Sequence, residues 1–177
     1  GAFSNNDTVT RVVLGENVRE IGENAFKNCS ELENVQFSAG LESIGANAFQ
    51  GCTALLSADI PDSVTEIGAY AFAYCSSLKS LELSDNLQSL ENSVFADCRD
   101  LESVTVPGGV RTVGELAFSG NESMRTLTLC EGIESIGVGD FYGCESLNED
   151  SVLSSVKTIG DMAFMVSTYL TGVTLAK

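Results

Sequence analysis

Phenylalanine recurs every 23 residues along this chain, without an insertion or a deletion. Eight of the nine phenylalanines follow the period, at Phe3, Phe26, Phe49, Phe72, Phe95, Phe118, Phe141 and Phe164. A fixed period of 20–50 residues is typical of a solenoid, in which each repeat buries its apolar face by stacking on its neighbours. The period therefore predicts a repeat scaffold, and it constrains architecture far more than function.

Other residue types recur in phase with the phenylalanines. A small residue precedes most of them, and a glycine stands four residues before, except where Glu91 takes its place. The third residue after each phenylalanine is Cys, Asn or Ser. One turn reads L-x-x-V-x-V-P-x-x-V-x-x-I-G-x-x-A-F-x-x-C-x-x, most clearly over 101–123. Each recurring apolar position is an inward column of the predicted stack.

The turn over 101–123 suggests its own local structure. Within residues 101–106, apolar Val104 and Val106 alternate with Thr105, which predicts a half-buried strand, and Pro107 then turns the chain. A second short extended stretch ends at Val113, and Gly114 permits a bend into a helical turn that carries Phe118 inward. We therefore predict an α/β fold. It is a right-handed solenoid of about seven turns, with a parallel sheet on one side and short helical or 3-10 elements on the other.

The complete motif resembles a known family. The pattern L-x-x-L-x-L, followed by I-G-x-x-A-F-x-x-C at a 23-residue period, is similar to BspA-like leucine-rich repeats. One full match consists of Ile67, Gly68, Ala71, Phe72 and Cys75. The resemblance covers residues 2–176. It implies a bacterial or protist protein that is secreted or displayed on the cell surface and takes part in adhesion.

Length and hydropathy bound the organisation. The 177 residues suit one domain over 1–177, and residues 2–9 align with 25–32 as the end of a truncated repeat. We therefore expect a fragment of a longer repeat array. No run approaches 18 apolar residues, so we expect no membrane insertion. We also expect a monomer.

The charge is strongly acidic. Twenty-five acidic and nine basic residues give a net charge of −16. Binding of nucleic acid needs a basic stripe that neutralises phosphates, and none is present. The acidic surface either keeps the chain soluble or attracts a cationic partner.

Five of the six cysteines occupy a single column, at Cys29, Cys52, Cys75, Cys98 and Cys144. Asn6 and Asn121 interchange with them, and asparagine forms no disulfide but does hydrogen-bond buried backbone. The favoured interpretation is a ladder of free, buried thiols; disulfides and a metal site are the alternatives. Cys130 stands outside this column, at the turn that leaves the strand, and we expect it to be exposed.

Catalytic groups are scarce. The chain has no histidine and no tryptophan, which removes the commonest general base and every Ser-His or Cys-His nucleophile. We expect no enzyme activity and no cofactor. Asp140 and Asp150 occupy nominally buried columns, with Glu145 and Glu149 nearby. The four are a candidate cation site, with Ca²⁺ the favoured ion. The alternative is a local bulge that exposes Asp150, with Asp140 capping a short helix.

Two surfaces are candidates for partner binding. The central outward column of the predicted sheet is small and polar, and its candidate residues are Gln36, Asp59, Glu82, Thr105 and Thr128. It lacks the Trp, Tyr and Arg anchors of binding hot spots, and such a face is more often an ordinary soluble sheet surface than a binding site. The second surface is an apolar end patch of Met162, Met165, Val166 and Tyr169. Those residues either cap the stack or contact a partner.

The lack of a catalytic set favours a non-catalytic module. The resemblance to BspA-like repeats implies that it binds a protein or glycan of a host or a neighbouring bacterium, outside the cell or on its surface. The alternative is a structural spacer in a larger surface protein, with no ligand of its own. An intracellular scaffold is a third hypothesis, because free thiols suit a reducing compartment.

Overall fold

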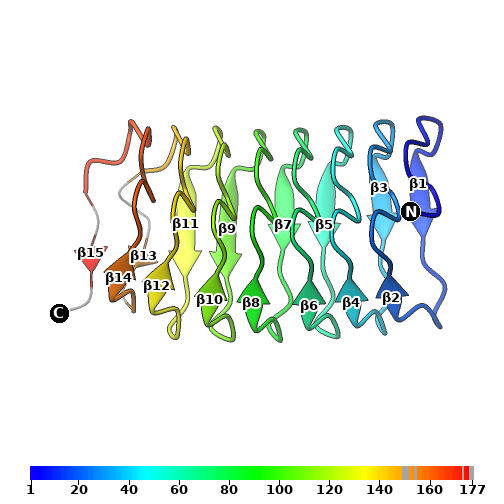
Figure 1. Ribbon diagram of the computed structural model, residues 1–177, viewed down its shortest axis with the longest axis horizontal. Coiled ribbons are helices and arrows are strands. Elements are labelled where there is room, and N and C mark those ends of the chain that lie inside the picture. Colours follow the sequence, from blue (N-terminus) through cyan, green and yellow to red (C-terminus); the bar gives the residue numbers. More distant parts are fainter. Residues whose placement is uncertain (149–151, 154, 173, 176–177) are drawn as a thin grey trace.

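Each 23-residue repeat forms one coil of a parallel β-solenoid, and successive coils lie side by side along one axis (Figure 1). This is a computed structural model, and it describes residues 1–148, 152–153, 155–172 and 174–175. None of the described residues belongs to a helix that is long and apolar enough to cross a membrane.

Two ladders of short parallel strands run along opposite parts of the coil. The odd-numbered ladder holds β1 (Arg11–Val13), β3 (Asn34–Gln36), β5 (Ser57–Asp59), β7 (Ser80–Glu82), β9 (Ser103–Val106), β11 (Thr126–Leu129), β13 (Val152–Leu153) and β15 (Thr174–Leu175). The even-numbered ladder holds β2 (Glu20–Ile21), β4 (Ser43–Ile44), β6 (Glu66–Ile67), β8 (Ser89–Leu90), β10 (Thr112–Val113), β12 (Ser135–Ile136) and β14 (Thr158–Ile159). All pairings among these strands are parallel.

The strand register follows the sequence period. Val12 pairs with Val35, and Leu127 pairs with Val104, each 23 residues away, so equivalent side chains stack in columns. Within β9 exposed and buried residues alternate strictly, as expected of a strand with one face on the core. β13 departs from the period, because Val152 pairs with Thr128, 24 residues earlier. A shift of one residue changes which side chains face inward.

The predicted α/β class and the helical or 3-10 elements are wrong. No helix occurs among the described residues, and the segment around each phenylalanine is a run of turns. The predicted parallel ladder is present, but a second ladder of two-residue strands accompanies it.

Backbone conformation explains why no helix forms. Residues two before and two after the phenylalanines have positive φ, at Asn5, Asn24, Asn28, Asn47, Gly51, Tyr70, Tyr74, Ser93, Asp97, Leu116, Gly120, Gly139, Gly143, Met162 and Val166. A left-handed residue every few positions interrupts a right-handed helix. The N–H of Phe49 donates to Ala71 of the next coil (2.7 Å), whereas the N–H of Cys52 donates three residues back, to Phe49 (3.1 Å). The Gly-Ala-Phe-Cys spacing of three to four residues thus imitates a helix while the backbone bonds run between coils.

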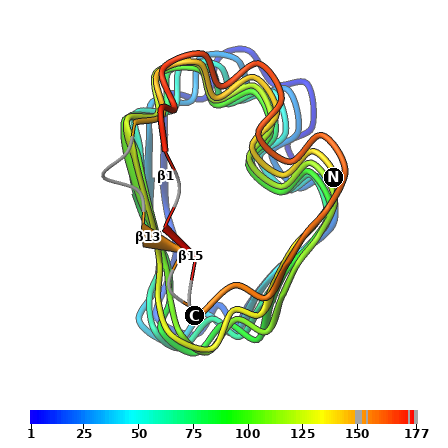
Figure 2. The same ribbon diagram turned by 90° about the vertical axis from the view of Figure 1, so that its left-hand side faces the viewer.

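The core is a stack of phenylalanine rings. Seven successive pairs, from Phe3–Phe26 to Phe141–Phe164, lie nearly parallel with ring centroids 5.1–5.6 Å apart. Along the axis the coils superimpose as a ring (Figure 2), and the rings from Phe49 to Phe141 are completely buried. Phe3, in the first coil, remains 48% exposed because no coil covers it. Stacking thus supplies each central repeat with apolar contacts on both sides.

Close approach between coils explains the glycine column. A Cβ on Gly45 would lie 2.7 Å from the backbone nitrogen of Glu23 in the preceding coil, and one on Gly114 would lie 2.6 Å from that of Asn92. Only glycine permits this contact without moving the backbone.

Candidate partner-binding surfaces

The cysteine column forms a hydrogen-bonded ladder inside the stack. Each member donates to the carbonyl of a phenylalanine 26 residues earlier: Cys29 to Phe3, Cys52 to Phe26, Cys75 to Phe49, Cys98 to Phe72, Asn121 to Phe95, Cys144 to Phe118 and Ser167 to Phe141, at 3.1–3.3 Å. The carbonyl needs one donor, and a thiol, amide or hydroxyl supplies it. This geometry confirms the predicted structural ladder and explains why the three residue types interchange.

The thiols of the ladder are free and buried. Burial raises the pKa of Cys52, Cys98 and Cys144 to about 12, and it raises the pKa of Cys75 well above its usual range. Such thiols stay protonated, so they are poor nucleophiles and poor metal ligands. Cys130 is free and half-buried, which is less exposed than predicted.

Asp140 is completely buried in a column otherwise held by small apolar residues. Its Oδ2 accepts the N–H of Gly137 at 2.6 Å, and its Oδ1 has no hydrogen-bond partner. Burial raises the pKa of this carboxyl to about 7, although backbone N–H groups at Gly137 and Ala117 lower it. The predicted helix cap is therefore a cap on a turn, because no helix is present.

The structure describes only one other member of the candidate cation site. Glu145 is exposed, and Glu149 and Asp150 lie outside the described residues. No group of three or more Cys, Asp or Glu side chains with metal-binding geometry occurs among the described residues. The geometry seen at Asp140, a backbone N–H directed at one oxygen, favours an acid hydrogen-bonded to protein.

The predicted polar column lies on the outward face of the odd-numbered ladder. Register places Asp59 beside Glu82 and Thr105 beside Thr128, while Gln36 extends the same column from β3. Gln36, Asp59, Glu82 and Thr105 are exposed, whereas Thr128 is half-buried. A shallow cleft of about 390 Å³ opens there, lined by residues that include Glu82, Thr105 and Cys130. The face offers carboxylates and hydroxyls at the spacing of adjacent strands, about 4.8 Å.

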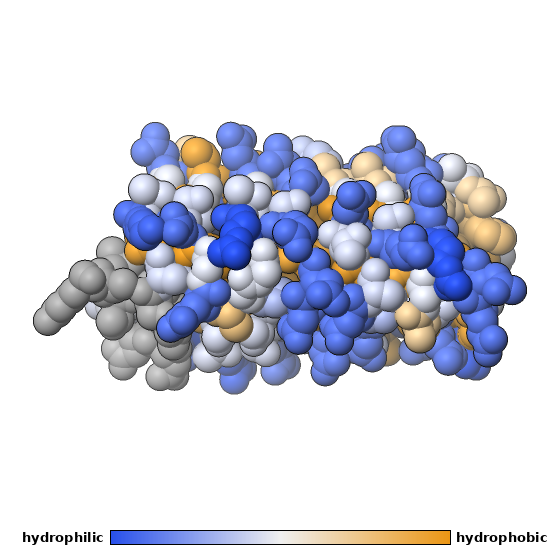
Figure 3. Space-filling view, turned by 90° about the horizontal axis from the view of Figure 1, so that it is seen from below, coloured by the Kyte–Doolittle hydropathy of each residue, from blue (hydrophilic) through white to orange (hydrophobic). Residues whose placement is uncertain are grey.

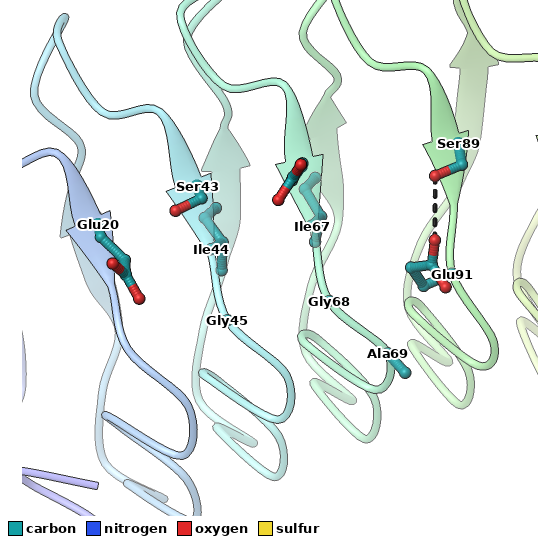
Figure 4. Close-up of a pocket in the computed structure, with 10 residues that line it drawn as sticks. Glu20, Ser43, Ile44, Gly45, Ile67, Gly68, Ala69, Ser89 and Glu91 are labelled. Atoms are coloured by element: carbon teal, nitrogen blue, oxygen red, sulfur yellow. Dashed lines mark hydrogen bonds between the residues drawn. The ribbon is translucent and has the colours of Figure 1, made fainter.

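A groove on the even-numbered ladder was missed by sequence reasoning. It measures about 440 Å³ and spans four coils, with Glu20, Ser43, Glu66 and Ser89 extending from successive strands (Figure 4). Ser89 Oγ donates to Glu91 Oε1 at 3.0 Å. The one sequence feature that could have indicated this groove is Glu91, which lines it and stands where the other repeats have glycine four residues before the phenylalanine. The groove presents acceptor oxygens above a floor of glycine backbone.

The end patch is assembled on the turns of the last described coil. Met162, Met165, Val166 and Tyr169 are all at least 42% exposed. They contrast with the mostly hydrophilic face that Figure 3 shows. The structure therefore places the four together on one coil, exposed as the contact hypothesis requires.

The described ion pairs engage few of the acidic residues. They join Arg19 to Glu42, Arg99 to Asp97 and Glu122, and Lys157 to Glu134, at 2.7–3.9 Å. All of these side chains are exposed except that of Asp97, which is partly buried. The pKa of the Glu134 carboxyl is lowered by its hydrogen bond to Lys157. Most of the other described acidic side chains are exposed, so they are available to a cationic partner.

Comparison with solved structures shows the same fold in bacterial proteins. A T. pallidum leucine-rich repeat protein is 28% identical, with a TM-score of 0.83, over 92% of this chain and 78% of that one. A leucine-rich repeat protein from Eubacterium ventriosum is 24% identical, with a TM-score of 0.83, over 90% and 43% of the two chains. A leucine rich cell surface protein from Faecalibacterium prausnitzii is 24% identical, with a TM-score of 0.50, over 99% and 62%. The chain thus spans less than two thirds of the latter two proteins.

The family model gives the most specific match. No match was found among curated proteins. The model of the BspA type leucine rich repeat region matches residues 1–125 and 89–177, in six copies. These two ranges together cover the whole chain and agree with the motif centred on Phe72. The chain belongs to the BspA-type leucine-rich repeat family.

Proposed function

We propose that this chain is a non-catalytic binding module of a bacterial cell-surface or secreted protein, which attaches to a protein or glycan outside the cell. Family membership supports the class of protein. The name of the Faecalibacterium prausnitzii relative, a leucine rich cell surface protein, supports the location. That the whole protein binds such a partner is likewise part of this proposal.

One structural observation carries the binding role. The odd-numbered ladder displays Asp59, Glu82 and Thr105 on three successive coils, all exposed to solvent, and Asp59 pairs in register with Glu82. Repetition at the strand spacing lets several weak polar contacts act together on one extended ligand. The solenoid core needs none of these side chains, so they are free to change without loss of the fold.

The experiment is an attachment assay on a panel of extracellular-matrix proteins and glycans. The variant is the triple substitution Asp59→Ala, Glu82→Ala and Thr105→Ala, and the control is Glu31→Ala, which is exposed outside this column. Binding that falls at least tenfold in the triple variant but not in the control supports the sheet face.

A spacer is the second candidate function. The small polar face lacks the Trp, Tyr and Arg anchors of strong interfaces, which is the observation that favours it. If the wild-type chain attaches to nothing on the panel, the spacer is the better description.

A further inference from the structure

A ridge of apolar side chains runs along the turns of the last three complete coils. We call it the C-terminal ridge, and it consists of Leu116, Val138, Tyr142, Met162, Met165 and Val166, each 38–56% exposed. The turns that carry it lie on the part of the ring where the N-terminus projects in Figure 2. Backbone hydrogen bonds join these turns, with Leu116 donating to Val138 (3.1 Å) and Gly143 donating to Met165 (2.9 Å). These bonds hold the three turns side by side, and the ridge includes three residues of the end patch.

Three ridge residues occupy backbone positions that disfavour their side chains. The φ angles are +60° at Leu116, +56° at Met162 and +67° at Val166. Equivalent positions in other coils are mostly Asn, Gly, Ser or Asp, with Tyr70 and Tyr74 as the other bulky residues. Bulky and β-branched side chains are strained in the left-handed region.

Burial of these side chains does not offset the backbone strain. Leu116, Met162 and Val166 are each at least 42% exposed, so they gain little burial in return for an unfavourable conformation. Gly139 has φ of +63°, and a Cβ there would lie 2.7 Å from Leu116 Cδ2, so its lack of a side chain leaves room for Leu116 along the ridge. Exposed strain of this kind indicates a role in contact with another molecule.

Charge identifies the kind of partner. The ridge turns, 114–122, 137–145 and 160–168, contain no Lys or Arg. By equivalent positions in the repeat, Glu115 and Asp161 share the column of Val138 at one edge of the ridge. Glu122 and Glu145 lie beyond its other edge. None of the ion pairs between described residues involves Glu115, Glu145 or Asp161. A second copy of this acidic chain would be repelled by such a rim.

We propose that the C-terminal ridge is the docking surface for a protein segment whose apolar side chains are flanked by Lys or Arg. The proposal rests on the proposed function and names its partner chemistry. Apolar residues of the segment cover the ridge, and its cations neutralise the free carboxylates at the rim.

The test uses a synthetic amphipathic peptide of alternating Leu and Lys as probe, and an equivalent peptide of Leu and Glu as its control. The ridge variant carries Leu116→Asn, Met162→Asn and Val166→Asn, which restore a residue favoured at positive φ. Leu56→Asn is the matched control, since Leu56 is 46% exposed and does not have positive φ. Tyr74→Gly is the control for strain relief alone, because Tyr74 has φ of +63° outside the ridge.

The expected result has two parts. The ridge variant melts higher than wild type, by about 2–4 °C for each relieved residue, yet it binds the Leu-Lys peptide at least tenfold more weakly. Leu56→Asn and Tyr74→Gly leave the affinity unchanged, and the Leu-Glu peptide does not bind.

Two results would overturn the proposal. The first is that the wild-type protein does not bind the Leu-Lys peptide, or that wild type and the ridge variant bind it with equal affinity. The other is a lower melting temperature of the ridge variant, which would make these residues structural. The attachment assay under Proposed function uses other ligands and variants of the sheet face, so its outcome is independent of the peptide test. Failure of the ridge proposal is therefore distinguishable from failure of the binding function.

Discussion

Replacing Asp140 with alanine is expected to stabilise the protein at neutral and alkaline pH. The carboxyl is completely buried, and its Oδ1 has no partner. Equivalent positions in most other coils hold alanine, so the substitution fits the existing packing. An unpaired buried charge is costly, whereas the methyl group of alanine is not.

The magnitude follows from the pKa. Burial raises the pKa of Asp140 from 3.8 to about 7. Each unit corresponds to about 1.4 kcal/mol, so a shift of this size corresponds to about 4 kcal/mol at most. Partial relaxation and water entry reduce such penalties, and we therefore expect a gain of about 2–4 kcal/mol at pH 8.

The pH dependence has a definite sign. Between pH 3.8 and about 7 the folded state holds a proton on Asp140 that the unfolded state has lost. The contribution of this proton to stability is thus fully present below pH 3.8 and is lost as pH rises through about 7. Asp140→Ala removes this dependence. At pH 4 the variant is equal to wild type or slightly less stable, because Gly137 N–H loses its acceptor.

Urea unfolding at pH 4, 6 and 8 and constant ionic strength measures the effect. Asp100→Ala is the control, since it removes an exposed acid and the same unit of net charge. The reasoning is refuted if Asp140→Ala is less stable than wild type at pH 8. It is refuted equally if the difference between the two proteins is the same at all three pH values.

Three further predictions concern the stack. Phe72→Ala should cost about 3–5 kcal/mol in denaturant unfolding, the usual range for a buried aromatic, and Phe164→Ala should cost less because its ring stacks on one side only; equal losses would contradict the stacking model. Thiol titration should find Cys130 reacting fastest in the folded state, since the ladder thiols are buried with raised pKa values, and mass spectrometry should find six reduced cysteines; two or more disulfides would reject the ladder. Gly45→Ala should destabilise the protein by more than the roughly 1 kcal/mol of an ordinary backbone substitution, because the new Cβ meets the Glu23 backbone; a neutral effect in thermal melts would show that the coils separate easily.

The sequence was sufficient for the columns of the stack. Stacked rings at Phe49 and Phe72, and the sharing of one hydrogen-bonding role by Cys98 and Asn121, both follow from a 23-residue period that brings equivalent positions together. A strictly periodic chain buries its apolar residues only if its coils stack in phase. Family, core and cysteine ladder were accordingly predictable.

The local structure on the turn side was not predictable in the same way. Gly, Ala, Phe and Cys at spacings of three to four residues suit a helix and a run of turns alike, because both bring such residues to one side. The choice was made by the neighbouring coil, whose carbonyl groups accept the N–H groups of residues such as Phe49 and Tyr70. Those bonds impose left-handed residues between the right-handed ones, and the sequence signal for them, a mixture of Asn, Gly, Tyr and Leu, is weak.

The surfaces divide along the same line. Periodicity alone determined that Asp59 and Glu82 share a column, and that Met162 and Val166 lie near one end. Only the tertiary structure revealed the groove over Glu20 and Glu66, the orphaned oxygen of Asp140 and the strain beneath the ridge. The physical reason is that the repeat dictates which residues stack, whereas burial, backbone angle and unpaired atoms depend on how closely each coil approaches the next.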